Sequence, residues 1–102
     1  MSVTSDTTQM IIDECTRRGY FVWRQNNLAV RGRKFKGMKG VPDIIGGDAG
    51  QPAKWFSVEV KTDKDKQSKA QKDFQFQIEK RGGRYLIAKT FTDFMQQMGW
   101  RK

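Results

Sequence analysis

An eight-residue segment with the sequence KWFSVEVK, from Lys54 to Lys61, alternates polar and apolar side chains for most of its length. Successive side chains of a β strand point to opposite faces of a sheet, so this period of two predicts a strand. One face would carry Phe56, Val58 and Val60, and the other Trp55, Ser57, Glu59 and Lys61. Because an apolar strand face must be covered, we expect the chain to form a sheet packed against helices.

The rest of the chain predicts the other elements of an α/β fold. A first helix is expected from Asp6 to Arg18, ending at Gly19, and a second between Ser68 and Gly82, where Ser68-x-x-Gln71 matches a capping box. A last helix would follow a cap at Thr90 or Thr92. Strands are expected at residues 20–23, 28–30, 43–45, 54–61 and 84–89. The order is α-β-β-β-β-α-β-α, a mixed central sheet flanked by helices. We found no repeat or internal linker, so we expect one domain over residues 1–102.

The charge balance favours a polyanionic partner. The chain has 20 Lys and Arg residues against 11 Asp and Glu, a formal net charge of +9, no histidine and a single cysteine. Phosphate neutralisation by basic residues makes nucleic acid the simplest partner. The absence of histidine excludes Ser-His-Asp hydrolases, and a lone cysteine excludes a cysteine zinc cluster. Neither a signal peptide nor a membrane-spanning run is recognisable, so an intracellular protein is expected.

Two carboxylates and a lysine form the most informative cluster. Glu59 and Lys61 lie two residues apart on one strand face, and Asp43 would approach Glu59 if its strand is the neighbour. Two such carboxylates repel unless a cation lies between them. Mg²⁺ prefers one or two carboxylates with water and phosphate oxygens, and the Val60 carbonyl could complete the ligand set. The alternative is an ordinary solvated strand face with Asp43 in a turn.

Three motifs in a fixed order resemble a known nuclease superfamily. Gly40-Val41-Pro42-Asp43, Glu59-Val60-Lys61 and Gln67-Ser68-x-x-Gln71 resemble the PD-(D/E)xK nucleases, and most closely the VRR-NUC (virus-type replication-repair nuclease) domain. The resemblance implies a restriction-endonuclease-like core and a Mg²⁺- or Mn²⁺-dependent DNA nuclease. The resemblance rests on the motifs, and a shared fold or motif does not establish an activity by itself.

The resemblance assigns a role to each matching position. Asp43 and Glu59 would be metal ligands, assisted by the Val60 carbonyl, Lys61 would be the catalytic lysine, and Gln71 would line the site from its helix. Glu14 would contact the metal through water from the first helix. For Glu14 the alternative is an ion pair with Arg18, four residues away on the same helix.

A basic stretch directly precedes the proposed site. Residues 15–42 contain eight Lys and Arg residues and no acidic residue. We expect the 31–39 loop to hold the DNA backbone, the alternative being a basic loop with no defined pose. The start of the second helix, at Ser68, could also hold a phosphate. The expected DNA-binding residues are therefore Arg31, Arg33, Lys34, Lys36, Lys39 and Ser68.

The aromatic residues of the strands and the lone cysteine are expected in the core. For Trp23, Trp55 and Tyr85 the alternative is a platform on which bases stack. Cys15 is expected to be a small buried helix residue.

The resemblance also suggests a substrate and an assembly. Stand-alone relatives resemble archaeal Holliday-junction resolvases, so we expect a homodimer that cuts branched DNA such as junctions or flaps. A phage or prophage origin and action in the cytoplasm of the host cell would fit. We expect the last helix and the tail after it to carry more apolar surface than one short helix can bury, which would support a dimer; these residues include Phe91, Met95, Met98 and Trp100. The alternatives are a restriction-type or exonucleolytic nuclease for linear DNA, a catalytically silent DNA-binding module, and an RNA-binding ribosomal-like protein.

Overall fold

The computed structural model of the chain describes residues 3–25 and 39–101, which form three helices and four strands. In chain order the elements are α1 (Val3–Arg17), β1 (Phe21–Arg24), β2 (Ile44–Gly47), β3 (Trp55–Val60), α2 (Lys69–Lys80), β4 (Arg84–Ala88) and α3 (Phe91–Met98). This is the mixed α/β arrangement that the sequence predicts. The expected strand at 28–30 lies outside the described residues.

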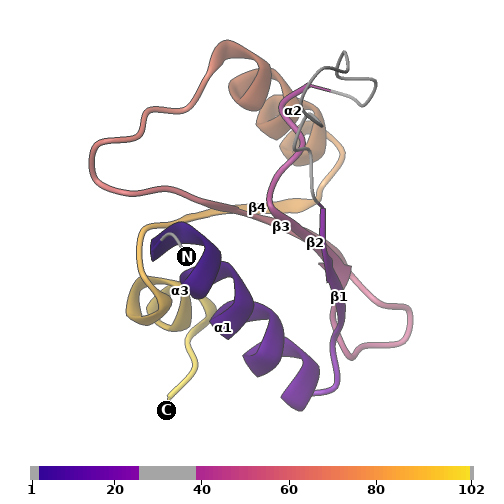
Figure 1. The fold of residues 1–102 in the computed structure, drawn as a ribbon. Helices are drawn as coiled ribbons and strands as arrows, with labels where there is room; N and C mark the ends of the chain where they lie inside the picture. The colour runs from indigo at the N-terminus through magenta and orange to yellow at the C-terminus, as the bar shows by residue number, and fades with distance from the viewer. Residues whose placement is uncertain (1–2, 26–38, 102) are drawn as a thin grey trace, which may run out of the picture.

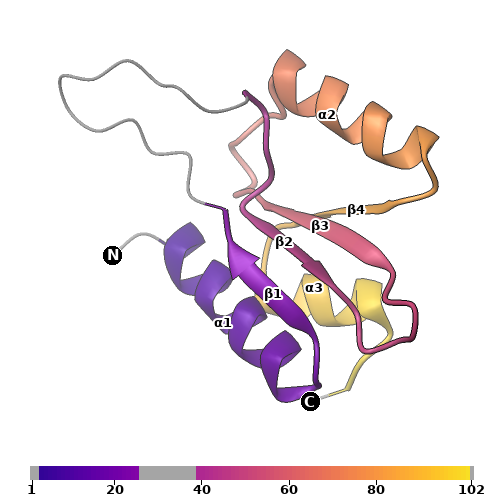
Figure 2. The same cartoon turned by 90° about the vertical axis from the view of Figure 1, so that its right-hand side faces the viewer.

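The four strands form one sheet in the order β1-β2-β3-β4. β2 pairs antiparallel with both β1 and β3, whereas β3 and β4 are parallel and are connected through α2. Helices α1 and α3 cover one face of this sheet and α2 lies on the other (Figures 1 and 2). The two faces are therefore covered by different elements, and each strand presents alternate residues to each of them.

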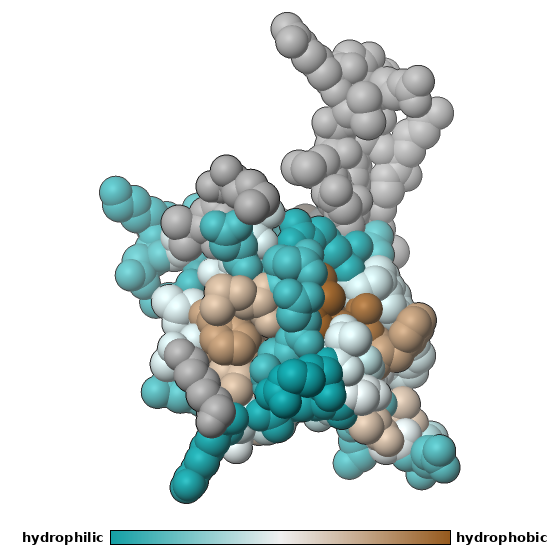
Figure 3. Space-filling model, turned by 60° about the horizontal axis from the view of Figure 1, so that its bottom comes forward, coloured by the Kyte–Doolittle hydropathy of each residue, from teal (hydrophilic) through white to brown (hydrophobic). Residues whose placement is uncertain are grey.

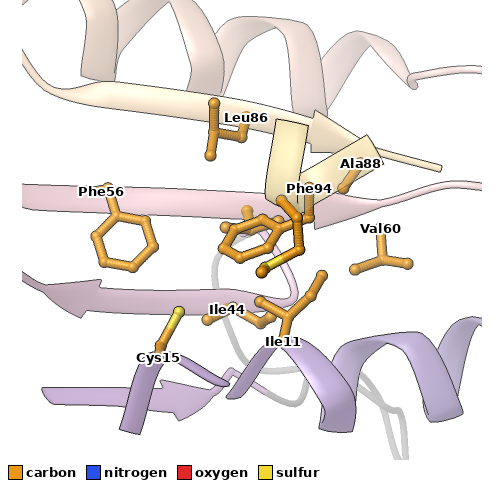
Figure 4. Packing of buried hydrophobic residues seen from close by; sticks show 10 residues of the cluster. Ile11, Cys15, Ile44, Phe56, Val60, Leu86, Ala88 and Phe94 are labelled. Atoms are coloured by element: carbon orange, nitrogen blue, oxygen red, sulfur yellow. The ribbon is translucent and has the colours of Figure 1, made fainter. Parts of the chain in front are cut away.

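The main core fills the space between the sheet and the pair α1 and α3. It contains the apolar face predicted for β3, together with side chains from β2, β4 and both helices (Figure 4). Cys15 is buried in it, as predicted, and burial raises the pKa of its thiol to about 12. The buried core residues are Ile11, Cys15, Ile44, Phe56, Val58, Val60, Leu86, Ala88, Phe94 and Met95.

The apolar residues of the C-terminal segment pack within their own chain. Met95 is buried, and Phe91, Met98 and Trp100 are partly buried against the same core. The Trp100 ring also receives the Arg18 guanidinium, whose Cζ lies 4.2 Å from the ring centroid. The expectation that these side chains leave an apolar surface for a second copy is therefore corrected.

Local signals at the helix ends account for most of the boundaries. Ser68 caps α2 with the complete capping box, and Thr90, one of the two expected caps, opens α3. The start of α1 differs from the prediction, since the helix begins at Val3 instead of Asp6. The Gln9 side-chain amide donates to Asp13 Oδ1, four residues ahead on the same helix, at 2.9 Å.

Helix α2 is held against the sheet more loosely than the other two helices. None of its side chains is buried, although Ala70, Phe74 and Ile78 follow the predicted four-residue spacing and are partly buried. Seen from the side of α1 and α3, the surface is largely hydrophilic, and apolar side chains reach it in separate small areas (Figure 3). Within the described ranges, no helix has the length and apolar character that crossing a bilayer requires.

The alternation of β2 predicts unequal costs for truncating its two isoleucines. Ile44 is fully buried under α1, whereas Ile45 points to the other face and is half-buried. Ile44→Ala should lower the free energy of unfolding by about 2–5 kcal/mol, because it leaves a cavity in the core. Ile45→Ala, the matched control, should cost clearly less in the same urea titration. Equal losses would contradict the assignment of faces.

Candidate active site

The start of β2 and the end of β3 are joined by a carboxylate. Ile44 is the partner of Val58 in the antiparallel register, and continuing that register places Asp43 opposite Glu59. The Val60 backbone N–H donates to Asp43 Oδ2 at 2.8 Å. Asp43 is therefore held where the two central strands of the sheet meet, on the face that Glu59 shares. The two carboxylates predicted as a pair from the sequence lie together.

Glu59 is a buried carboxylate with an unsatisfied oxygen. Its side chain belongs to a residue only 4% exposed, and among the described residues its Oε1 has no hydrogen-bond partner. Burial, followed by the charge and the hydrogen bonding of Asp43, raises the pKa of Glu59 to about 8. A buried acceptor without a partner is unfavourable, so a ligand that satisfied it would stabilise the site.

The capping box of α2 brings Gln71 to Glu59. The Ser68 backbone N–H donates to Gln71 Oε1 at 2.8 Å, and the Gln71 backbone N–H donates to Ser68 Oγ at 3.1 Å. Because the amide oxygen is engaged, the amide NH₂ is the group that is available to Glu59. Hydrogen bonding from Gln71 favours the charged carboxylate and acts to lower the pKa of Glu59.

Lys61 follows the pair on the same strand and provides the positive charge. Its backbone N–H donates to the Ala88 carbonyl at 2.9 Å, which keeps this residue in line with the end of β4. The Lys61 ammonium also acts to lower the pKa of Glu59, so it lies close enough to interact with the pair. Asp43, Glu59, Lys61 and Gln71 are thus brought together, as predicted.

Gly40 closes the segment before Asp43 against the first turn of α2. Its φ is +83°, and a Cβ built on it would lie 2.3 Å from the Ala70 carbonyl oxygen. A side chain there would meet helix backbone that cannot rotate away. The glycine therefore permits the close approach that places the Asp43 segment beside Gln71.

The residues present suit a divalent cation. The described residues contain no cluster of three or more His, Cys, Asp or Glu side chains. Asp43 and the unsatisfied Glu59 oxygen provide two carboxylates, which is within the number that Mg²⁺ uses when water and phosphate supply the rest. The Val60 carbonyl remains the expected third ligand.

Glu14 is not brought to this pair. It lies on α1, which covers the face of the sheet opposite Glu59. Its carboxylate pairs with Arg17 and with Arg18, whose Nε lies 2.6 Å from Glu14 Oε2, and these hydrogen bonds lower the pKa of Glu14. Glu14 therefore forms the ion pair with Arg18, which is the alternative expectation from the sequence.

The expected DNA-binding residues divide between described and undescribed segments. Arg31, Arg33, Lys34 and Lys36 lie outside the described residues. Lys39 is exposed and lies beside α2, where it lines a pocket with Ala70 and Phe74. At Ser68 the backbone N–H donates to Gln71 and the hydroxyl oxygen accepts from Gln71 in the capping box, so the hydroxyl proton is the group of this residue that remains to donate to a phosphate.

Two of the three strand aromatics are not in the core. Tyr85 is 7% exposed, as predicted, and burial raises the pKa of its hydroxyl to about 12. Trp23 and Trp55 are 37% and 57% exposed, so the expectation that they are core residues is wrong. Alternation predicts their face correctly, but α2 does not reach far enough across that face to cover them.

The fold and the site define an α/β domain with two carboxylates at the meeting ends of neighbouring strands. A solved structure described as "VRR_NUC domain" superposes with a TM-score of 0.72, covering 97% of this chain and 97% of that chain at 18% sequence identity. The chain therefore has the fold of a VRR_NUC domain, which confirms the resemblance drawn from its motifs. No family model matches the sequence, and neither does any curated protein.

The raised pKa of Glu59 predicts a pH-dependent stability of the metal-free protein. Between about 4.5 and 8 the folded protein keeps a proton that the unfolded chain has lost, so the stability falls as the pH rises through this window. Glu59→Gln cannot titrate and should gain in Tm relative to the wild type between pH 5 and pH 8. Thermal unfolding in EDTA measures this. Parallel pH profiles for the two proteins would contradict it.

The close contact at Gly40 predicts that a side chain there lowers the free energy of unfolding by more than left-handed backbone strain alone would. Gly82 has a similar φ of +81°, but a Cβ there would have no neighbour within 4 Å. Gly82→Ala should cost about 1–2 kcal/mol from strain. Gly40→Ala should cost more, because it also displaces the start of α2. If both variants unfold at the same urea concentration, the close approach at Gly40 is unimportant.

Proposed function

We propose that this protein is a Mg²⁺- or Mn²⁺-dependent DNA endonuclease that hydrolyses phosphodiester bonds in branched DNA. The observation that carries the proposal is the buried Glu59, with one unsatisfied oxygen, opposite Asp43 at the meeting ends of β2 and β3. The VRR_NUC fold and the net charge of +9 support the same class of activity.

Asp43 and Glu59 would hold the cation, with the Val60 carbonyl as a third protein ligand. A bound divalent cation would lower the pKa of a coordinated water and stabilise the charge that develops on the scissile phosphate. The fixed position of Asp43, given by the Val60 N–H, means that this ligand does not need to reorganise on binding.

Lys61 and Gln71 would act on the groups around the reacting phosphate. The Lys61 ammonium would neutralise the phosphate oxygens or orient the attacking water, and hydrogen bonding from Gln71 would favour the charged form of Glu59. Water attacks phosphorus, the bond from phosphorus to the leaving oxygen breaks, and the water proton passes to solvent or to the leaving oxygen. This route needs no histidine, in agreement with the composition.

The proposed enzyme acts on branched DNA and does so as a homodimer. A basic chain reaches DNA mainly through phosphate contacts, which carry little sequence information, so selectivity for DNA structure is the expected kind. A four-way junction offers two equivalent strands, and two copies would cut them symmetrically. Because the apolar residues of α3 are packed in their own core, we infer the dimer from the symmetry of the junction and not from an apolar surface.

Removing either carboxylate should abolish cleavage and retain binding. Asp43→Asn and Glu59→Gln should lower the rate on a labelled four-way junction at least ~100-fold, since the cation supplies several kcal/mol of transition-state stabilisation. Junction binding in EDTA should stay equal or become tighter, because neither substitution adds a negative charge beside the phosphate. Gel-based cleavage with Mg²⁺, Mn²⁺ or EDTA, beside linear duplex, is the measurement.

Glu79→Gln is the matched control, since Glu79 is an exposed carboxylate of α2. It should cut like the wild type. Calorimetric titration with Mn²⁺ in the absence of DNA gives a second readout, in which wild type and Glu79→Gln bind and the two site variants do not. Cleavage of linear DNA alone would keep the chemistry and discard the branched substrate. Near wild-type cutting by either site variant would overturn the metal assignment.

A further inference from the structure

An aromatic cluster lies exposed on the same face of the sheet as Glu59. Phe21, Trp23 and Trp55 are 71%, 37% and 57% exposed. The ring centroids of Phe21 and Trp23 are 5.6 Å apart, and those of Trp23 and Trp55 are 6.2 Å apart. The tryptophan rings meet edge to face at 76°, so the edge of one ring covers part of a face of the other, and the rest of their surface accounts for the exposed fractions.

The backbone of β2 makes room for this cluster. In the sheet register Gly47 lies between Phe21 of β1 and Trp55 of β3. A Cβ built on Gly47 would lie 3.9 Å from Trp55 Cε3, so the indole extends over the glycine. Helix α2 packs against β4 at the other side of this face. The β1 and β2 half is therefore left open by the described residues.

A basic pocket borders the cluster at Trp55. This pocket, of about 340 Å³, is also lined by Lys54, Arg81 and Arg84, of which Arg84 lies on the α3 side of the sheet and donates to the Gln97 carbonyl. Among the described residues, the one carboxylate that lines this pocket belongs to Asp48, whose Oδ1 already accepts two backbone N–H groups of its own loop. Exposed aromatic rings next to a pocket whose lining carries net positive charge suit a base with its phosphate.

The cluster is too small and too positively surrounded to suit a second copy of the chain. With ~150–250 Å² for a fully exposed aromatic side chain, the exposed fractions amount to about 250–400 Å². A stable interface needs about 800 Å² from each partner. A symmetric pairing through this face would also bring the basic groups around Trp55 on each copy toward each other.

We propose that Phe21, Trp23 and Trp55 form a stacking platform for unpaired bases of the DNA strand that is cut. Trp55 and Glu59 are four residues apart on β3, about 13 Å at ~3.3 Å per residue, which a few nucleotides span. The platform deepens the proposed nuclease function and rests on it for the identity of the strand. It favours substrates with unpaired nucleotides close to the scissile phosphate.

Binding of a labelled oligothymidine strand in EDTA, followed by fluorescence anisotropy, tests the platform without any cleavage. Trp55→Ala and Trp23→Ala should weaken binding about 5- to 100-fold, the range for loss of a base-stacking aromatic. Binding of a blunt duplex of the same length should change less than twofold. Trp55→Phe should recover most of the loss. Phe76→Ala, which removes an equally exposed aromatic of α2, is the control and should bind like the wild type.

The remaining outcomes overturn the platform. Equal weakening of single strand and duplex would mean that Trp55 acts through general contacts, and unchanged binding would mean that bases do not stack there. If sedimentation shows that Trp55→Ala converts a dimer to a monomer and single-strand binding is unchanged, the face is an interface between copies. The nuclease site and the platform are tested separately, because Glu59→Gln should lose cleavage and keep full oligothymidine binding. The platform can therefore succeed or fail independently of the nuclease activity.

Discussion

The hydrogen bond from the Val60 N–H to Asp43 is the contact on which the arrangement of the site depends. It joins the last residue of β3 to the residue before β2, and so holds one carboxylate opposite the other across two antiparallel strands. A shift of one residue in this register would move Glu59 to the core face, under α1. The core between β2, β3 and α1 therefore stabilises the register that the site requires.

Holding two carboxylates together, one of them buried, is unfavourable for the metal-free fold. The elements that surround Glu59 each reduce this cost in part: Lys61 by its charge and Gln71 by its amide. One oxygen of Glu59 still has no partner among the described residues. The site thus has the character of a functional one, in which the fold tolerates an unsatisfied group that a ligand can satisfy.

Local sequence patterns predicted the helices and strands, and the order of the three motifs predicted which residues lie together at the candidate site. The alternation in 54–61 and the capping box at Ser68 depend on neighbouring residues, so they are visible in the sequence. The exposure of Trp23 and Trp55 depends on how far α2 extends across the sheet, which no local pattern encodes. Glu14 has a suitable residue type, but its helix covers the wrong face, which is likewise a property of the tertiary arrangement.

The loose attachment of α2 has a consequence for how the site opens. Of the three described helices, α2 alone has no buried side chain, and polar contacts such as those of Gln67 with Gln75 and Tyr85 help to fix it in place. Elements with few buried contacts unfold locally at a lower free energy than the whole domain. A transient detachment of α2 would carry Gln71 away and admit water to Glu59 while the sheet stays intact. The protonation of the buried carboxylate is thereby linked to the local unfolding equilibrium of a single helix.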